Sequence, residues 1–283
     1  MKKQMNEETT KTIPYRTKKT KVEIYNDHFE NAKRYWIQHA QLIIADIPYN
    51  LWNNAYASNP QWYIDGDNSN WESKLAGKAF FDTDKYFKIN NFFDFCTRYL
   101  KKEPKSGGGE RWKSSDAPAM IVFCAFEQIP FVIEQWKKHW LKKSYPLVFI
   151  KNFSSQVLKA NMKIVWATEY AIVLYREKLP KFRNIWADWK WHMVFNRFQR
   201  ERDWKNIPKI HPTQKPVNVL KKLIETFTDP WDVVIDPCCW SWSTLRACVE
   251  TGRTGIWFEI KKDFYNRAKN EMLTGIIQNP PLF

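Results

Sequence analysis

The fold is decided by the stretch Val233-Val234-Ile235-Asp236-Pro237-Cys238-Cys239-Trp240-Ser241-Trp242-Ser243-Thr244-Leu245. Its apolar start predicts a buried strand ending at Asp236, and then a tight loop and the first turn of a helix. Strand-to-helix loops that bind nucleotides use glycine, because the backbone takes positive φ and approaches the ligand closely. Tryptophan stands at positions 240 and 242 instead. The stretch therefore predicts a nucleotide loop with bulky indoles where the ligand would lie.

The rest of the chain alternates strand-like and helix-like segments. Short apolar runs predict strands at 41–46, 119–125 and 146–151, and a pair of strands at 163–167 and 169–175. Amphipathic runs predict helices at 83–100, 127–143 and 217–227. This alternation predicts a doubly wound α/β sheet.

The composition is that of one folded domain with a polyanionic partner. The 283 residues are enough for a full core, and their formal net charge is +15. Such an excess of positive charge favours nucleic acid as the partner, although a solvated basic surface would have the same composition. Residues 1–21 predict a flexible basic arm or a tail without a role, and residues 22–283 predict the single domain.

The sequence offers no sign of a membrane segment, a metal site or a disulfide framework. No apolar run approaches the roughly 20 residues that a membrane span needs. The five cysteines lack paired spacing, and no cluster of His, Cys and Asp suggests a metal. We expect a cytoplasmic protein, in a bacterial host cell or a phage-infected cell.

Glycine is scarce and tryptophan abundant, with eight and 16 residues respectively. Average composition would give about 20 glycines in this length. Many tryptophans occupy turn-like contexts, as in Asp229-Pro230-Trp231-Asp232, where glycine would be natural. Further tryptophans in positions suited to glycine are Trp52, Trp71, Trp136, Trp140, Trp166, Trp186, Trp204 and Trp257.

Three explanations of this imbalance remain open at the level of sequence. The chain is a degenerate enzyme that has lost its cofactor, or a working enzyme with an altered pocket. Alternatively, UGA codons that some bacterial lineages and their phages read as glycine are rendered here as tryptophan. The third explanation accounts best for substitutions at many unrelated turns.

Four motifs, in this order, resemble the beta-order class of amino-methylating DNA methyltransferases. Asp46-Ile47-Pro48-Tyr49 resembles the Asp-Pro-Pro-Tyr catalytic motif, with Ile47 replacing the first proline. Residues 211–216 (His-Pro-Thr-Gln-Lys-Pro) resemble the segment before the cofactor loop. Residues 236–244, with glycine read at 240 and 242, resemble the cofactor loop of S-adenosylmethionine-dependent methyltransferases, and Glu259 is the acidic residue ending the next strand. The resemblance covers roughly residues 40–270.

The resemblance implies a Rossmann-like, mostly parallel seven-stranded sheet and a role for each motif. The carboxylate of Asp46 and the carbonyl of Ile47 would accept hydrogen bonds from an exocyclic amine, followed by Pro48 and by Tyr49, which would stack on the flipped base. Aspartate rather than serine at the first position favours adenine N6. The implied S-adenosylmethionine-binding residues are Thr213, Lys215, Pro216, Asp236, Pro237, Trp240, Ser241, Trp242, Ser243, Thr244 and Glu259. Ser243 and Thr244 would also cap the helix.

Two segments are candidates for contact with double-stranded DNA. Residues 50–80 form a long polar insertion. Residues 177–207 interleave aromatic and basic side chains, which suits target recognition, or else a helical cover packed on the sheet. The arginines predicted to bind DNA are Arg183, Arg197, Arg200 and Arg202. We therefore expect an adenine-N6 DNA methyltransferase of a phage or a restriction-modification locus; the alternatives are an inactive DNA-binding relative and, more distantly, an RNA or protein methyltransferase.

Overall fold

The computed structural model describes the chain in eleven segments. They are residues 21–48, 87–105, 116–139, 141–151, 157–159, 164–165, 168–183, 197–198, 207–208, 214–239 and 242–273. The predicted basic arm (except residue 21), the insertion at 50–80 and most of the segment 177–207 lie outside these residues.

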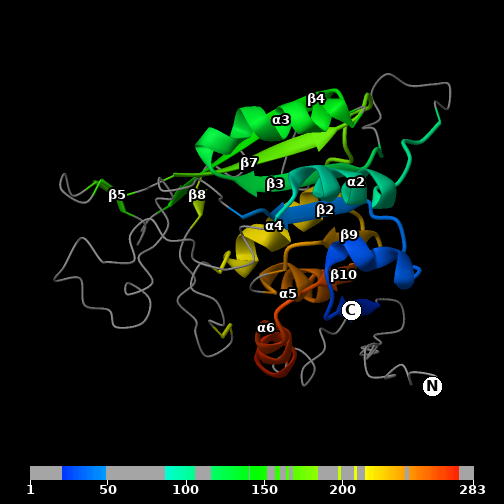
Figure 1. Ribbon diagram of the computed structural model, residues 1–283, viewed down its shortest axis with the longest axis vertical. Coiled ribbons are helices and arrows are strands. Elements are labelled where there is room, and N and C mark those ends of the chain that lie inside the picture. Colours follow the sequence, from blue (N-terminus) through cyan, green and yellow to red (C-terminus); the bar gives the residue numbers. More distant parts are fainter. Residues whose placement is uncertain are drawn as a thin grey trace, which may run out of the picture.

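The described strands form one large sheet and one small one. The strands are β1 (Val22–Tyr25), β2 (Leu42–Asp46), β3 (Ala119–Cys124), β4 (Lys143–Lys151), β5 (Val157–Lys159), β6 (Ile164–Val165), β7 (Thr168–Tyr175), β8 (Arg197–Phe198), β9 (Val233–Asp236) and β10 (Thr254–Phe258). The large sheet has the order β1-β10-β9-β2-β3-β7-β4-β8, and β5 pairs with β6 (Figure 1). The predicted mostly parallel sheet is confirmed, with the two-residue β8 as an eighth strand.

Every strand pair of the large sheet is parallel except those of β7, which is antiparallel to β3 and β4. The parallel strands carry their carboxyl ends to one edge of the sheet. Because β7 runs the other way, its first residues lie at that same edge. In the register, Glu169 at the start of β7 is opposite Phe149, near the end of β4. This carboxyl edge therefore collects residues from six neighbouring strands, β10, β9, β2, β3, β7 and β4.

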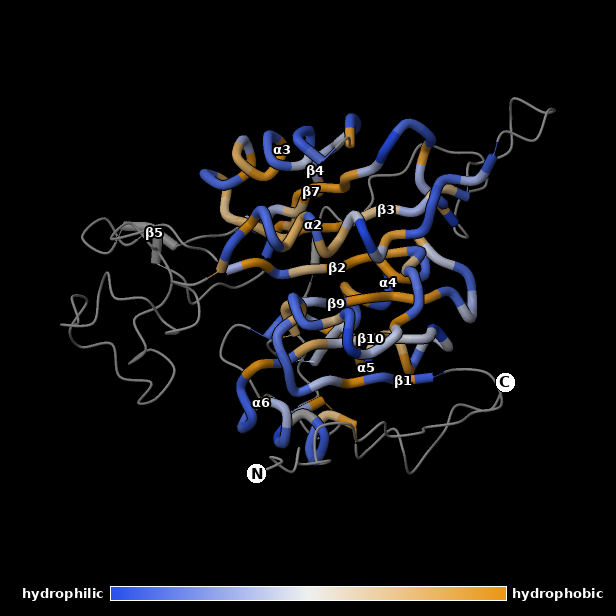
Figure 2. Tube along the Cα trace, turned by 45° about the vertical axis from the view of Figure 1, so that its right-hand side comes forward, coloured by the Kyte–Doolittle hydropathy of each residue, from blue (hydrophilic) through white to orange (hydrophobic). Residues whose placement is uncertain are grey.

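Helices cover both faces of the sheet. They are η2 (Phe29–Arg34), α2 (Ile89–Tyr99), η5 (Phe126–Gln128), α3 (Ile129–Lys138), α4 (Val217–Phe227), α5 (Ser243–Glu250), α6 (Lys262–Arg267) and η6 (Ala268–Met272). Apolar side chains of η2, α2 and α3 form a core on one face, and those of α4, α5 and η6 form a second core on the other. Figure 2 shows apolar residues along the central strands and alternating polar and apolar residues along the helices. This is the doubly wound arrangement expected from the sequence.

The structure corrects two sequence-based expectations and adds one strand that was missed. The runs at 163–167 and 169–175 do not pair with each other, because β6 pairs with β5 while β7 inserts between β3 and β4. The helix predicted to extend to residue 143 ends at Lys138, and β4 begins at Lys143. The edge strand β1 was not predicted at all.

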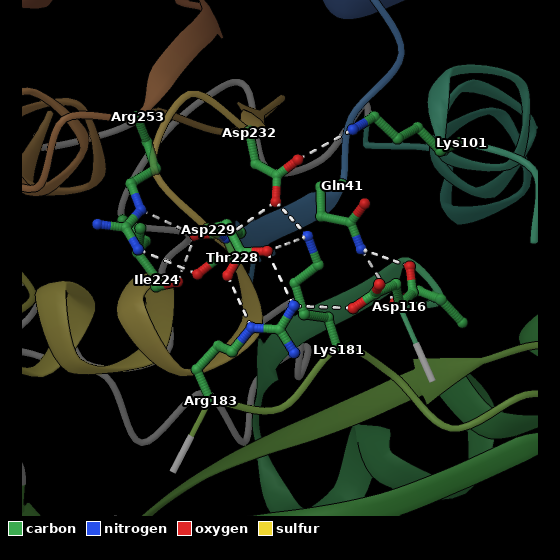
Figure 3. A network of polar contacts seen from close by, with 11 residues as sticks. Gln41, Lys101, Asp116, Lys181, Arg183, Ile224, Thr228, Asp229, Asp232 and Arg253 are labelled. Carbon is green, nitrogen blue, oxygen red and sulfur yellow. Dashed lines mark hydrogen bonds and ion pairs between the residues drawn. The ribbon is translucent and has the colours of Figure 1, made fainter. Parts of the chain in front are cut away.

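The amino edge of the sheet is held by a network of ion pairs (Figure 3). Lys181 Nζ lies 2.8 Å from Asp229 Oδ2 and 2.7 Å from Asp232 Oδ2. Arg183 donates to both oxygens of Asp229, at 2.7 and 2.9 Å, and to Asp116 at 2.8 Å. The hydrogen bond from Arg183 is the largest cause of a strongly lowered pKa at Asp229. The network ties the chain leaving β7 to the turns that precede β9 and β3.

Positive φ outside glycine is confined to tryptophan in the described residues: Trp36 (50°), Trp231 (73°) and Trp242 (60°). Trp231 is the third residue of the turn Asp229-Pro230-Trp231-Asp232, which is closed by a 3.1 Å bond from Asp232 N–H to Asp229 O. Proline second and positive φ third define a type II turn, which favours glycine at the third position. Trp36 follows the end of η2, another common place for glycine. All three residues therefore have the left-handed backbone that glycine adopts most readily.

Candidate active site

Asp46 is the last residue of β2, a buried central strand between β9 and β3. The turn that follows is fixed to the end of β3. The Ile47 N–H donates to Phe123 O at 3.2 Å. The Gln128 amide donates to Pro48 O at 3.0 Å and accepts from the Ala125 N–H at 3.0 Å. Residues 46–48 of the predicted catalytic motif are thus held at the carboxyl edge.

Lys215 joins the catalytic motif to β7. Its Nζ lies 3.0 Å from Asp46 Oδ2 and 2.7 Å from Glu169 Oε1. The same nitrogen is 4.9 Å from the centre of the Phe123 ring, within cation–π distance. Lys215 stands just before α4, whose first turn begins after Pro216. Residues 214–216 of the predicted segment therefore reach the site through this lysine.

Two more carboxyl groups end the neighbouring strands. Asp236 closes β9, and Glu259 follows β10; their exposed fractions are only 5% and 7%. Burial raises the pKa of Asp236 to about 7, against the hydrogen bonds from Thr244 and from the Cys238 N–H (3.0 Å). Burial likewise raises the pKa of Glu259 to about 8, although the Lys261 N–H donates to it at 2.8 Å. Buried acids with raised pKa values are typical of functional sites.

Trp242 sits directly before α5 with φ 60° and ψ 12°, the left-handed conformation that glycine adopts most readily. Its indole is 1% exposed and meets the Tyr265 ring edge-to-face at 5.7 Å. The expected capping by Ser243 and Thr244 is wrong: the N-cap is Trp242 without a side-chain hydrogen bond, and Thr244 bonds Asp236. In the described part of the predicted cofactor loop, residue 242 therefore has the left-handed backbone that suits glycine, with an indole attached to it.

Trp257 fills the interior beside the same loop. Its ring covers Gly255, where an added Cβ would lie 1.3 Å from the indole. The Nε1 atoms of Trp242, Trp257 and Trp136 are all buried without a hydrogen-bond partner. A buried indole N–H usually finds a partner, and a lost one costs about 1–3 kcal/mol. Each of these three indoles therefore places an unsatisfied N–H donor in the protein interior.

The structure brings most of the predicted residues together at the carboxyl edge. They are Asp46, Ile47, Pro48, Lys215, Pro216, Asp236, Pro237, Trp242, Ser243, Thr244 and Glu259. Tyr49, Thr213, Trp240, Ser241, Arg200 and Arg202 lie outside the described residues. Arg197 is placed in β8 by its backbone alone, and Arg183 lies in the network at the amino edge. The predicted DNA contacts of these arginines stay predictions.

Three residues at this edge were not predicted from the sequence: Gln128, Lys151 and Glu169. Lys151 Nζ lies 4.0 Å from Glu169 Oε1. The sequence does not reveal that these three residues lie at this edge, because β3, β7 and β4 become neighbours only in the folded chain. The sequence signal available for Glu169 was a charged residue at the start of an otherwise apolar strand.

A family model described as DNA methylase matches residues 137–270, which contain Glu169, Lys215, the cofactor-type loop and Glu259. Similarity to curated DNA methyltransferases extends over most of the chain. The chain is therefore similar to the DNA methylase family, by its model over residues 137–270 and by these relatives over most of its length.

Two relatives illustrate the extent of the similarity. The DNA adenine methyltransferase YhdJ of Escherichia coli K12 is 25% identical over 259 residues, which cover 85% of this chain and 79% of YhdJ. The type II methyltransferase M2.DpnII of Streptococcus pneumoniae is 22% identical over 267 residues, 92% of each chain.

Solved structures share the fold of this chain. The M1.HpyAVI–SAM complex aligns with a TM-score of 0.59 and 18% identity, covering 89% of this chain and 99% of that one. The cytosine-N4-specific PvuII DNA methyltransferase aligns with a TM-score of 0.57 and 14% identity, covering 89% and 94%. The sheet described above is therefore the Rossmann-like sheet of S-adenosylmethionine-dependent methyltransferases.

Within the described ranges, no helix is long and apolar enough to cross a membrane. Nor do His, Cys, Asp and Glu side chains in those ranges gather into a group of three that could hold a metal ion.

Proposed function

We propose that this chain methylates the N6 amine of adenine in double-stranded DNA, using S-adenosylmethionine. The proposal depends above all on Asp46, a carboxylate at the end of the central strand β2. Asp236 ends the adjoining strand β9, and Glu259 follows β10, the next strand of the sheet. Support for adenine comes from the Asp-x-Pro-Tyr motif and from the similarity to YhdJ, a DNA adenine methyltransferase. The net charge of +15 suits a polyanionic substrate.

The residues of the motif would activate a weak nucleophile. An exocyclic amine is unreactive because its lone pair is delocalised into the ring. Hydrogen bonds from this amine to the Asp46 carboxylate and the Ile47 carbonyl would localise the lone pair and aim it at the methyl group. Burial of the site strengthens these bonds by excluding water. The Asp46 carboxylate, hydrogen-bonded to the amine, would take up the proton that the methylated amine gives up.

The carboxylates fit the cofactor, whose bound form supplies an electrophilic methyl group. Glu259 would accept hydrogen bonds from the ribose hydroxyls, the role of the acidic residue in dinucleotide folds. Asp236 would lie near the methionine ammonium. Both acids are buried and have raised pKa values, so a ligand that brings donors or positive charge would stabilise their ionised forms.

The indoles of Trp242 and Trp257 do not fit this picture, and we infer that the functional protein carries glycine at position 242. Loss of cofactor binding alone would affect only the cofactor loop. Glycine-type backbone instead occurs under tryptophan at three unrelated places, after η2, in the turn before β9 and before α5. Positive φ at tryptophan in all three supports glycine codons rendered as tryptophan over local decay of the site. The codons for residues 36, 231 and 242 decide this directly.

Nucleoside analysis tests the proposed reaction. The variant Trp240→Gly/Trp242→Gly, with Trp231→Gly and Trp257→Gly added in a second protein, is incubated with DNA and S-adenosylmethionine. Mass spectrometry of the digested DNA should then show N6-methyladenine. N4-methylcytosine alone would refute the adenine assignment, and no transfer by a folded variant that binds both DNA and cofactor would refute the reaction.

The second candidate is an inactive relative that binds DNA, which the buried indoles at the cofactor loop favour. Salt-dependent DNA binding by the unaltered chain without methyl transfer is expected from both candidates. They differ in the glycine variants, because a decayed enzyme would have lost other parts of its site and would stay inactive after the loop is restored.

A further inference from the structure

Glu169 is a buried carboxylate that the proposed reaction does not use. It stands at the start of β7, the one antiparallel strand in the described part of the large sheet, and its side chain is 12% exposed. Burial alone would raise its pKa, but the ammonium groups of Lys215 and Lys151 hold the pKa below its ordinary value. Glu169 is therefore ionised inside the protein, a state that exists only with paired cations.

Lys215 shares its charge between two carboxylates from different strands. The distances are 2.7 Å to Glu169 Oε1 and 3.0 Å to Asp46 Oδ2. Its own side chain is 11% exposed, and the Phe123 ring lies beside the ammonium group. A lysine has a long flexible stem, so its nitrogen is located by the groups around it. Glu169 makes the shorter of the two contacts and so fixes where the ammonium meets Asp46.

We propose that Glu169 is a positioning residue for methyl transfer, acting through Lys215 to hold the Asp46 carboxylate in one orientation. The proposal rests on the proposed role of Asp46 as acceptor of the substrate amine. Glu169 also takes up part of the lysine charge, so that the ammonium does not neutralise Asp46 fully. A carboxylate that keeps its charge is a stronger hydrogen-bond acceptor for the amine.

Kinetics of Glu169→Gln test the proposal in the form of the protein that transfers methyl groups. We expect kcat to fall about 10–100-fold, the scale of a slightly misplaced catalytic group, with KM for DNA nearly unchanged. The matched control is Asp232→Asn. Asp232 is also a buried carboxylate held by two lysines, Lys181 at 2.7 Å and Lys101 at 3.0 Å, but at the opposite edge of the sheet.

The two variants separate positioning from stability. Asp232→Asn should lower the melting temperature about as much as Glu169→Gln and leave kcat within about twofold of the parent, since it lies away from the reacting groups. If Glu169→Gln keeps kcat, the proposal is overturned. It is equally overturned if both variants lose activity in proportion to their loss of stability.

The pH dependence adds a readout that a purely structural role would not move. The charged and titratable groups that surround Asp46 are Lys215, Glu169, Lys151, Asp236, Cys124 and Cys238. Glu169→Gln removes a negative charge, so Asp46 stays ionised to lower pH and the acid limb of the kcat profile moves down. Lys215→Met removes the cation, so the acid limb moves up. If the acid limb of the kcat profile stays at the same pH in both variants, Glu169 and Lys215 are not electrostatically coupled to Asp46.

A direct titration distinguishes failure of this inference from failure of the proposed function. The ¹³C chemical shift of the Asp46 carboxyl carbon, assigned with Asp46→Asn, is followed against pH in the unaltered chain and in the two variants, without substrate. Opposite displacements in Glu169→Gln and Lys215→Met support the coupling even if no methyl transfer is found. Identical midpoints in all three proteins overturn it, whatever the activity.

Discussion

Substitutions at Trp242 and Trp231 should reverse the usual ranking of alanine over glycine. Both residues have left-handed backbone, which costs an L-residue about 1–2 kcal/mol and glycine almost nothing. Glycine also gains more backbone freedom than alanine on unfolding, and this lowers the stability of the glycine variant by about 0.4–1 kcal/mol. At each position, Trp→Gly should therefore be more stable than Trp→Ala by about 0.5–1 kcal/mol. Both variants lose the whole indole, so the comparison isolates the backbone.

Trp136 provides the matched control. It is buried as completely as Trp242 and its Nε1 likewise lacks a partner, but it lies on helix α3. Glycine in a helix is less stable than alanine by about 1 kcal/mol, so the order at position 136 should be the ordinary one.

Urea unfolding of the six variants measures these differences. Equal m-values confirm that the free energies of unfolding can be compared. Alanine equal to or better than glycine at both 231 and 242 would refute the reasoning that these are glycine positions. The same proteins can be titrated with S-adenosylmethionine by calorimetry, where the unaltered chain should bind poorly and Trp242→Gly, with Trp240→Gly, should bind better.

Three further outcomes are expected. Asp46→Ala in the active protein should abolish methyl transfer and leave DNA binding nearly intact; substantial turnover would remove this residue from the mechanism. Arg197→Ala with Arg200→Ala should reduce the slope of log affinity for DNA against log salt concentration by about one unit per lost phosphate contact. Arg183→Ala should instead chiefly lower the melting temperature. An unchanged slope in the double variant would place recognition in the segment 50–80. The pKa of Asp236 is raised to about 7 in the folded chain, against about 4 in the unfolded chain, so its contribution to stability is complete below pH 4 and is lost as the pH rises through 7. Asp236→Asn should therefore flatten the fall in melting temperature between pH 4 and 8. Parallel melting curves of the two proteins against pH would contradict this.

The central strands could be predicted because both of their faces are covered. The residues of β2, β3 and β9 form apolar runs that end in a polar residue or a turn, and this pattern identifies a buried parallel strand. β1 escaped prediction because its four residues include Glu23 and follow a highly charged segment. Its burial depends on pairing with β10, far away in the sequence.

The site was predictable only as far as motifs reach. Asp46, Asp236 and Glu259 each end a strand, and the ends of parallel strands meet at one edge. Glu169 and Gln128 depend on which strands become neighbours, and that order is not written in any local pattern. The strand pairing expected at 163–175 was wrong for the same reason: adjacency in sequence competed with the better burial of β7 between β3 and β4.

The two anchored ends of residues 184–214 make this stretch a natural unit of exchange. Arg183 is bound to Asp229 and Asp116 on one side, and Lys215 is bound to Asp46 and Glu169 on the other. A chimera that takes the intervening residues from a relative with a different target sequence would leave both anchors, and the catalytic carboxylate, untouched. On the prediction that this stretch recognises the DNA target, new specificities would arise by recombination at two fixed junctions, without a new fold or a new reaction.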